Sequence, residues 1–100
     1  MSYTLNFTTV EGENNPGDIT VYALSTCGFC KRALQFLRDH SITFRYVYVD
    51  LLPFEVKQEL KNDLKEKAGR NVGFPFAIIN DNKYLIGFKE NEWREELKVA

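Results

Sequence analysis

The amino-acid sequence predicts one α/β domain built on a four-stranded mixed sheet that is flanked by helices. One hundred residues are about the length of a single domain, and the 44% that are hydrophobic supply one core. From residue 19 onward, apolar runs with strand and helix periods follow one another in the order β-α-β-α-β-β-α. The first three elements predict a parallel strand pair and the later hairpin an antiparallel pair, so the sheet is mixed.

The first half of this domain reads as strand, helix, strand. The short apolar run 19–24 predicts the first strand. Apolar residues then recur three, four and seven positions after Cys30, which predicts a helix that ends near residues 40–41. The aromatic and β-branched segment 44–49 predicts the second strand.

The second half adds two helices and a hairpin. Apolar residues recur every four positions across 53–68, with Pro53 suited to a first helical turn and Gly69 to the position after the end. Two short apolar runs, 76–80 and 83–87, flank an Asp-Asn pair and predict a hairpin. An apolar stripe predicts a last helix over about 90–98.

Residues 1–18 are expected to be an N-terminal extension to a domain that covers 19–100. Tyr3, Leu5 and Phe7 alternate with polar residues, which is the period of a strand with one buried face. The polar stretch that follows contains Asn-Asn-Pro-Gly, a strong turn signal. The extension therefore adds an edge strand or stays mobile.

Charge and composition exclude several function classes. The formal net charge is −1 with no basic block, so nucleic acid and polybasic membrane binding are not expected. No apolar run approaches the ~20 residues that span a bilayer, and the N-terminus does not resemble a secretory signal. We expect a cytoplasmic monomer.

The two cysteines, Cys27 and Cys30, are the strongest functional signal. A disulfide between them closes too small a loop to stabilise the fold much, so the spacing points to chemistry. They lie where the first strand meets the first helix, and unpaired N–H groups at a helix N-terminus favour an anion. We therefore expect Cys27 to be the nucleophilic thiolate, and Cys30, one turn deeper, to displace a partner from a mixed disulfide.

Two other interpretations of the cysteine pair remain. A zinc site needs about four ligands, and the rest of the chain offers one histidine, His40, at the far end of the same helix. No metal is therefore expected. Inert cysteines in an interaction protein are the second interpretation, which the strand-to-helix position disfavours.

Two segments resemble the glutaredoxin family, a branch of the thioredoxin-fold superfamily. Residues 20–33 read TVYALSTCGFCKRA and resemble the family's active-site segment, and residues 73–80 read GFPFAIIN and resemble its Thr-Val-Pro segment. Gly87 falls in the family's Ile-Gly-Gly position. Leu24 stands where many members have a lysine that contacts glutathione, and Phe88 stands at the second glycine.

The resemblance implies a thioredoxin-like (glutaredoxin) fold with sheet order 4-3-1-2 and the third strand antiparallel to the others. It implies a cis peptide bond at Pro75 beside the dithiol. The backbone of Phe74 would then pair with an extended thiol substrate, with Phe29 and Gly87 completing the binding surface.

The implied activity is thiol–disulfide exchange on protein disulfides or glutathione-mixed disulfides. No cofactor is expected to stay bound. Glutathione is a candidate co-substrate, and either glutathione or a reductase would supply electrons. The alternative is a glutaredoxin-type iron–sulfur cluster carrier, because Gly28-Phe29 also occurs in the cluster-binding monothiol members of the family.

Overall fold

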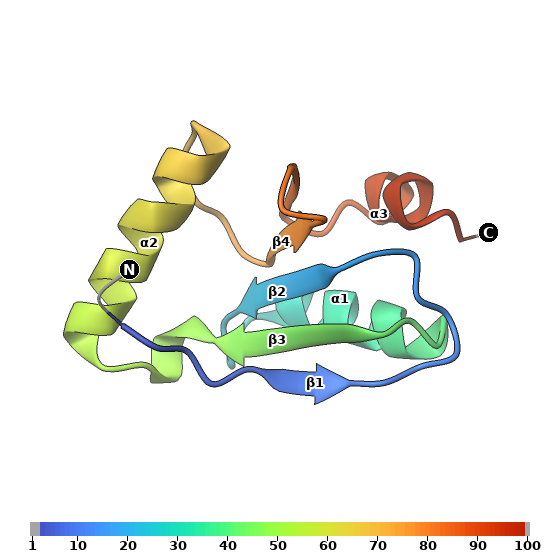
Figure 1. Ribbon diagram of the computed structural model, residues 1–100, viewed down its shortest axis with the longest axis horizontal. Coiled ribbons are helices and arrows are strands. Elements are labelled where there is room, and N and C mark those ends of the chain that lie inside the picture. The colour runs from blue at the N-terminus through green and yellow to red at the C-terminus, as the bar shows by residue number, and fades with distance from the viewer. Residues whose placement is uncertain (1–2, 100) are drawn as a thin grey trace.

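A five-stranded mixed sheet forms the centre of the computed structural model, which describes residues 3–99 (Figure 1). Its strands are β1 (Thr8–Val10), β2 (Ile19–Ala23), β3 (Phe44–Tyr48), β4 (Phe76–Ile79) and β5 (Lys83–Ile86). Their spatial order is β1-β3-β2-β4-β5. Residues 1–2 and 100, at the start of the predicted extension and the end of the predicted domain, lie outside the described residues.

The strand order expected for the domain is confirmed. Strands β2 and β3 are parallel neighbours, whereas β4 runs antiparallel to β2 on one side and to β5 on the other. Counted from residue 19, this is the order 4-3-1-2 with the third strand reversed. Since β2 and β3 are parallel, their carboxyl ends meet at one edge of the sheet.

Three helices connect the strands: α1 (Gly28–Asp39), α2 (Phe54–Ala68) and α3 (Glu90–Leu97). A short 3-10 turn, η1 (Val49–Leu51), leads from β3 into α2. Pro53 is the N-cap of α2, so it lies just before the first turn and not within it as predicted. Gly69 follows the helix in the left-handed region, with φ 69°, as predicted. Within residues 3–99, none of the helices has both the length and the apolar composition of a bilayer-spanning segment.

The two faces of the sheet bury separate apolar clusters. On one face, α1 and α3 contribute buried side chains such as Leu34, Leu37 and Trp93. On the other face, Leu60 and Leu64 of α2 pack against side chains that include Tyr22 of β2. The alternation of inward and outward residues along β2 therefore supplies both clusters, which holds the strand in the middle of the molecule.

The segment before β2 packs on the α2 face and at the edge of the sheet. Tyr3, Leu5 and Phe7 are half-buried and contact the α2-side cluster, so the alternation correctly marks one buried face. The hydrogen-bonded strand begins after these alternating residues, because β1 pairs antiparallel with β3 only over Thr8–Val10. The Tyr3 hydroxyl donates to Oδ2 of Asp63 in α2 at 2.6 Å.

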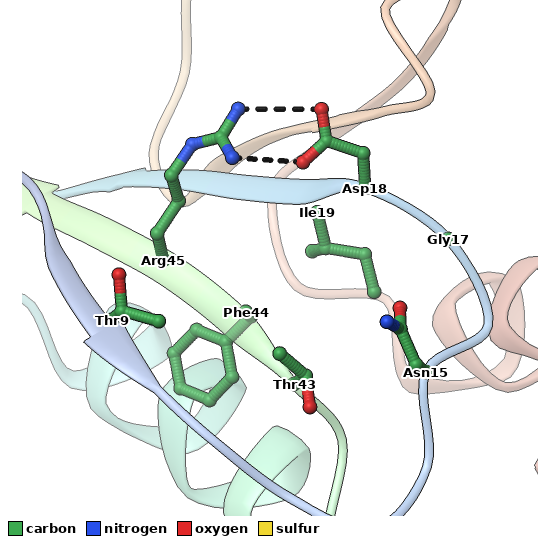
Figure 2. Close-up of a pocket in the computed structure, with 8 residues that line it drawn as sticks. All are labelled: Thr9, Asn15, Gly17, Asp18, Ile19, Thr43, Phe44 and Arg45. Atoms are coloured by element: carbon green, nitrogen blue, oxygen red, sulfur yellow. Dashed lines mark hydrogen bonds and ion pairs between the residues drawn. The ribbon is translucent and has the colours of Figure 1, made fainter.

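A hollow near the start of β2 lies away from the cysteines (Figure 2). The guanidinium of Arg45 in β3 donates to both carboxylate oxygens of Asp18, at 2.8 and 3.3 Å. Cys27 follows the opposite end of β2, about 15 Å of strand away. No residue that the sequence predicts for the redox site lines this hollow.

Replacing Phe7 with alanine should lower the free energy of unfolding by about 1–2 kcal/mol. Burying a whole phenylalanine side chain contributes about 1.5–3 kcal/mol, and Phe7 is only partly buried, with its ring 6.0 Å from that of Tyr22. Urea unfolding measures the change. The neighbouring exposed residue gives the control, since Asn6→Ala should cost less than about 0.5 kcal/mol. Equal effects would show that the N-terminal segment does not pack on the sheet.

Candidate active site

The junction of β2 and α1 holds Cys27 at the start of the helix. After the fully buried strand, the Cys27 N–H donates to the carbonyl of Leu24 at 3.3 Å and closes a turn. Cys27 then adopts an extended backbone, with φ −92° and ψ 120°, as the N-cap of α1. Its carbonyl accepts the first helical bond from the Lys31 N–H at 3.1 Å. The helix thus begins at Gly28, two residues earlier than the apolar spacing indicates.

The Cys27 sulfur lies against the free N–H groups of α1. It accepts a hydrogen bond from the backbone N–H of Cys30 at 3.1 Å and is partly exposed to solvent. The first turn of α1 contains no acidic residue, whereas the first turns of α2 and α3 do. A negative charge on this sulfur is therefore stabilised by the N–H groups and by the positive end of the helix dipole.

The Cys30 sulfur lies in a different environment. The residue is fully buried, and its sulfur accepts a weak hydrogen bond from the Leu24 N–H at 3.4 Å. Burial, and then the hydrogen bond with Cys27, raises the pKa of the Cys30 thiol to about 12. Both cysteines are free thiols in the structure. Cys30 is therefore the protonated, inner member of the pair at neutral pH.

The segment before β4 lies at the same edge of the sheet as the cysteines. The Phe74–Pro75 peptide bond is cis, which confirms the expectation from the sequence. Because Phe76 pairs with Tyr22 in antiparallel register, the residues before Phe76 lie beside the end of β2. Phe74 is half-buried and Pro75 is fully buried.

Gly87, which follows β5, completes this edge. Its N–H donates to the carbonyl of Pro75 at 2.8 Å, and its φ of 79° lies in the left-handed region that favours glycine. The Gly87 carbonyl accepts from the Trp93 indole N–H at 3.0 Å, which anchors the segment to α3. The structure therefore brings Pro75 and Gly87 to the edge that carries the dithiol.

The two positions that depart from the family pattern are occupied by packed apolar side chains. Leu24 is half-buried and contacts both apolar clusters. The ring of Phe88 packs between those of Phe36 and Trp93, with centroid distances of 5.7 and 5.3 Å. Leu24 therefore contributes burial where many members of the family have a lysine that contacts glutathione, and Phe88 contributes burial at the position of the family's second glycine.

Phe29 projects from the first turn of α1 into solvent and is 58% exposed. The guanidinium of Arg32 stacks on its ring at 5.5 Å from the centroid. With Gly28, these two residues line a shallow hollow in front of α1. An exposed aromatic ring thus lies on the first turn of α1, between the two cysteines in the sequence.

Ser25 and Asp50 join the loops after β2 and β3, and the sequence interpretation missed this contact. Asp50 accepts the Ser25 N–H at 2.8 Å through one carboxylate oxygen and the Ser25 hydroxyl through the other. These hydrogen bonds lower the pKa of Asp50, and the bond from the Ser25 hydroxyl has the larger effect. One signal could have found the pair, since each residue follows the end of one of two parallel strands. The contact fixes the loop that leads to Cys27.

No group of three or more His, Cys, Asp or Glu side chains within residues 3–99 is placed to hold a metal ion. The iron–sulfur carrier alternative needs a partner chain and glutathione, so it stays a prediction.

Comparison with known proteins identifies the family. The family model described as glutaredoxin matches residues 19–83. The chain belongs to the glutaredoxin family. A search of curated proteins found no match.

Solved structures agree with this assignment. A glutaredoxin from Methanosarcina mazei Go1 is 40% identical, over 91% of this chain and 86% of that one, with a TM-score of 0.78. Methanoredoxin from Methanosarcina acetivorans is 39% identical, over 83% and 86% of the two chains, with a TM-score of 0.72. A glutaredoxin from Archaeoglobus fulgidus is 26% identical, over 82% and 87%, with a TM-score of 0.73.

The chain therefore has the thioredoxin-like fold and is a glutaredoxin-like dithiol oxidoreductase with a Cys27-x-x-Cys30 active site.

The raised pKa of Cys30 predicts slow alkylation of that thiol. In a Cys27→Ser variant, the rate of labelling by iodoacetamide should rise about tenfold per pH unit between pH 7 and 9 without a plateau, because only the thiolate reacts. Burial, the largest cause of the raised pKa of Cys30, persists in this variant. Mass spectrometry follows the labelling. In the matched Cys30→Ser variant, the partly exposed Cys27 should be labelled much faster, and equal rates would contradict the assignment of inner and outer thiols.

The lowered pKa of Asp50 predicts a pH-dependent contribution to stability. Ionised Asp50 stabilises the folded state above its ordinary pKa of 3.8, and this contribution is lost as the pH falls through the lower folded-state pKa. Asp50→Asn does not titrate, so its deficit in the free energy of unfolding should be largest near pH 7 and smaller at pH 3. Urea unfolding at both pH values measures the deficit.

Ser25→Ala removes the hydroxyl donor and should show the same trend as Asp50→Asn, because it deletes the first cause of the lowered pKa of Asp50. A deficit in either variant that does not change with pH would show that the carboxylate does not act through Ser25.

Proposed function

We propose that this chain reduces disulfides by thiol exchange, with Cys27 as the attacking thiolate and Cys30 as the resolving thiol. The observation that carries the proposal is the contrast between the two sulfurs. The Cys27 sulfur is partly exposed and accepts the Cys30 N–H at the helix start, while the Cys30 sulfur is buried, which raises the pKa of its thiol. The outer sulfur can meet a substrate, and the inner one can meet only Cys27.

The exchange proceeds in two steps. The Cys27 thiolate attacks one sulfur of the substrate disulfide, the substrate S–S bond breaks, and the departing sulfur leaves as a thiolate that takes a proton from solvent. Cys30 then loses its proton to solvent and attacks the Cys27 sulfur, and the mixed S–S bond between Cys27 and the substrate breaks. The second substrate sulfur leaves as a thiolate that takes a proton from solvent, so the substrate gains two electrons and two protons and the enzyme becomes the Cys27–Cys30 disulfide.

The release step is favoured by a change in the pKa of Cys30. In the free enzyme, burial is the largest cause of the raised pKa of Cys30, and the hydrogen bond with Cys27 and a charge on Cys27 raise it further. Once Cys27 is in a mixed disulfide, both of these contributions disappear. Cys30 thus becomes easier to deprotonate at the stage at which it must attack.

We further assign substrate alignment to Phe29, Phe74, Pro75 and Gly87. Pro75 and Gly87 share a hydrogen bond beside the end of β2, so Phe74 lies where its backbone can pair with a chain attached to Cys27. Phe29, two residues after Cys27, offers an exposed ring. Candidate substrates are protein disulfides and glutathione-mixed disulfides, and glutathione is the candidate co-substrate.

Single-cysteine variants separate the two roles. Cys27→Ser should abolish reduction of every disulfide, because no outer thiol remains to attack. Cys30→Ser should keep part of its activity on glutathione-mixed disulfides, where one enzyme thiol suffices, and lose reduction of intramolecular protein disulfides. Steady-state assays coupled to NADPH oxidation measure both activities. Full disulfide reductase activity in the Cys27→Ser variant would overturn the proposal.

The electron donor is identified by running the same assay with two donors. One reaction contains glutathione with glutathione reductase, and the other contains thioredoxin reductase alone. Turnover in only one of them identifies the donor. The cluster-carrier alternative has its own signature, which is visible absorbance after anaerobic iron–sulfur reconstitution that is lost in the Cys27→Ser variant.

A further inference from the structure

The backbone of Leu24 contacts both cysteines of the active site. Its N–H donates to Cys30 Sγ at 3.4 Å, and its carbonyl accepts the Cys27 N–H at 3.3 Å. The first of these bonds bears on the exchange reaction, because Cys30 must carry a negative charge when it attacks the mixed disulfide. A hydrogen bond to a charged acceptor is about twice as strong as a bond to a neutral one.

Strand pairing ends just before Leu24. The last paired residues of β2 are Tyr22, opposite Phe76 of β4, and Ala23, opposite Tyr48 of β3. In Figure 1, α1 lies behind β2 and β3, so the chain reverses direction in the loop that Leu24 begins. The orientation of the Leu24 backbone therefore depends on contacts that this loop makes.

Asp50, which follows β3, supplies such a contact. Its two carboxylate oxygens accept the N–H and the hydroxyl of Ser25, the residue directly after Leu24. The Ser25 N–H and the Leu24 carbonyl belong to one planar peptide group, so holding Ser25 fixes the plane of that group. Leu24 is thus held by the sheet through Ala23 on one side and by Asp50 on the other. This leaves its backbone little freedom to turn the N–H away from Cys30.

The effects on Cys30 differ in sign and in size. Burial and the hydrogen bond with Cys27 raise the pKa of Cys30, whereas the Leu24 N–H lowers it. The charge of Asp50 also raises the pKa of Cys30, but by less than the Leu24 N–H lowers it. Asp50 therefore has a small unfavourable effect on a Cys30 thiolate through its charge and a larger favourable one through the backbone that it holds.

We propose that Asp50 and Ser25 are positioning residues of the release step. They hold the Leu24 N–H where it stabilises the negative charge that develops on Cys30 during attack on the mixed disulfide. This inference rests on the proposed function, in which Cys30 resolves that disulfide. The first attack does not depend on the contact, because the Cys27 sulfur accepts its hydrogen bond from the Cys30 N–H within α1. Loss of the contact should therefore slow the second step and not the first.

A stopped-flow reaction separates the two steps. Pre-reduced protein is mixed with excess dithiobis(nitrobenzoate), an aromatic disulfide whose thiolate product absorbs visible light. Attack by Cys27 releases the first thiolate at a rate that depends on the reagent concentration. Attack by Cys30 on the mixed disulfide then releases the second thiolate at a rate that does not depend on it.

Ser25→Ala should slow the second phase about threefold, which lies within the contribution of one hydrogen bond, and leave the first phase unchanged. The variant keeps the charge of Asp50, so the change reports the contact alone. Ser25→Thr keeps a hydroxyl and should restore the wild-type second phase. The matched control is Thr26→Ala, which removes an exposed hydroxyl from the next position of the loop and should keep both phases at the wild-type rate.

A double-mutant cycle tests whether Ser25 acts through Asp50. In an Asp50→Ala background the hydroxyl has lost its acceptor, so Ser25→Ala should not change the second phase further. A threefold effect in both backgrounds would remove Asp50 from the proposal and so contradict it.

The NMR signal of the Leu24 amide gives a direct readout in isotope-labelled, reduced protein. In Ser25→Ala this signal should shift and its proton should exchange faster with solvent. The amide of Val21, in the paired part of β2, should keep its wild-type exchange rate. A Leu24 amide that does not respond would show that the contact does not position this N–H.

The outcomes separate this inference from the proposed function. Equal slowing of both phases in Ser25→Ala would show a general loss of loop structure, and an unchanged second phase would show no effect on release. Either result overturns the positioning role and leaves the proposed function standing. A wild type that releases only one thiolate would show that Cys30 does not resolve the mixed disulfide, and would overturn the proposed function itself.

Discussion

The hydrogen bond from the Cys30 N–H to the Cys27 sulfur is the contact on which the rest of the site depends. It exists because β2 ends and α1 begins within a few residues, which leaves Cys27 as the N-cap. The residue three positions later then has its N–H directed at the capping sulfur and its side chain directed into the core. One local geometry thus gives two chemically identical thiols different environments, one partly exposed beside helix N–H groups and one buried.

The sheet then determines what surrounds the thiols. Because β2 and β3 are parallel, the loops after them share an edge, and Asp50 can hold Ser25. Because β4 is antiparallel to β2 and β5 to β4, the segment before β4 and the residue after β5 reach the same edge. Pro75 and Gly87 are joined there by a hydrogen bond. Residues from four parts of the chain therefore lie at the end of the sheet that Cys27 follows.

The apolar side chains at two family positions change the character of this edge. Leu24 and Phe88 are half-buried and packed, so they stabilise the fold at the positions of the family's glutathione-contacting lysine and second glycine. Leu51 and Phe54, in contrast, contribute nothing to the core and are largely exposed.

The sequence by itself determined the order of the elements and the position of the cysteines at a strand-to-helix junction. These depend on local signals, namely apolar periodicity, Gly69 at a helix end and the short Cys-x-x-Cys spacing. The order of the four strands in the sheet was implied by the resemblance to the family. It marked the buried alternation of residues 3–7 but placed the strand too early, because a strand exists only where a partner offers hydrogen bonds, and β3 offers them to Thr8–Val10.

Only the tertiary structure decided that Asp50 holds Ser25 and that Leu51 and Phe54 remain exposed. Each of these depends on the packing of segments far apart in the chain. Local sequence patterns specify how a segment folds, but they do not specify which distant segment covers it or leaves it open to solvent.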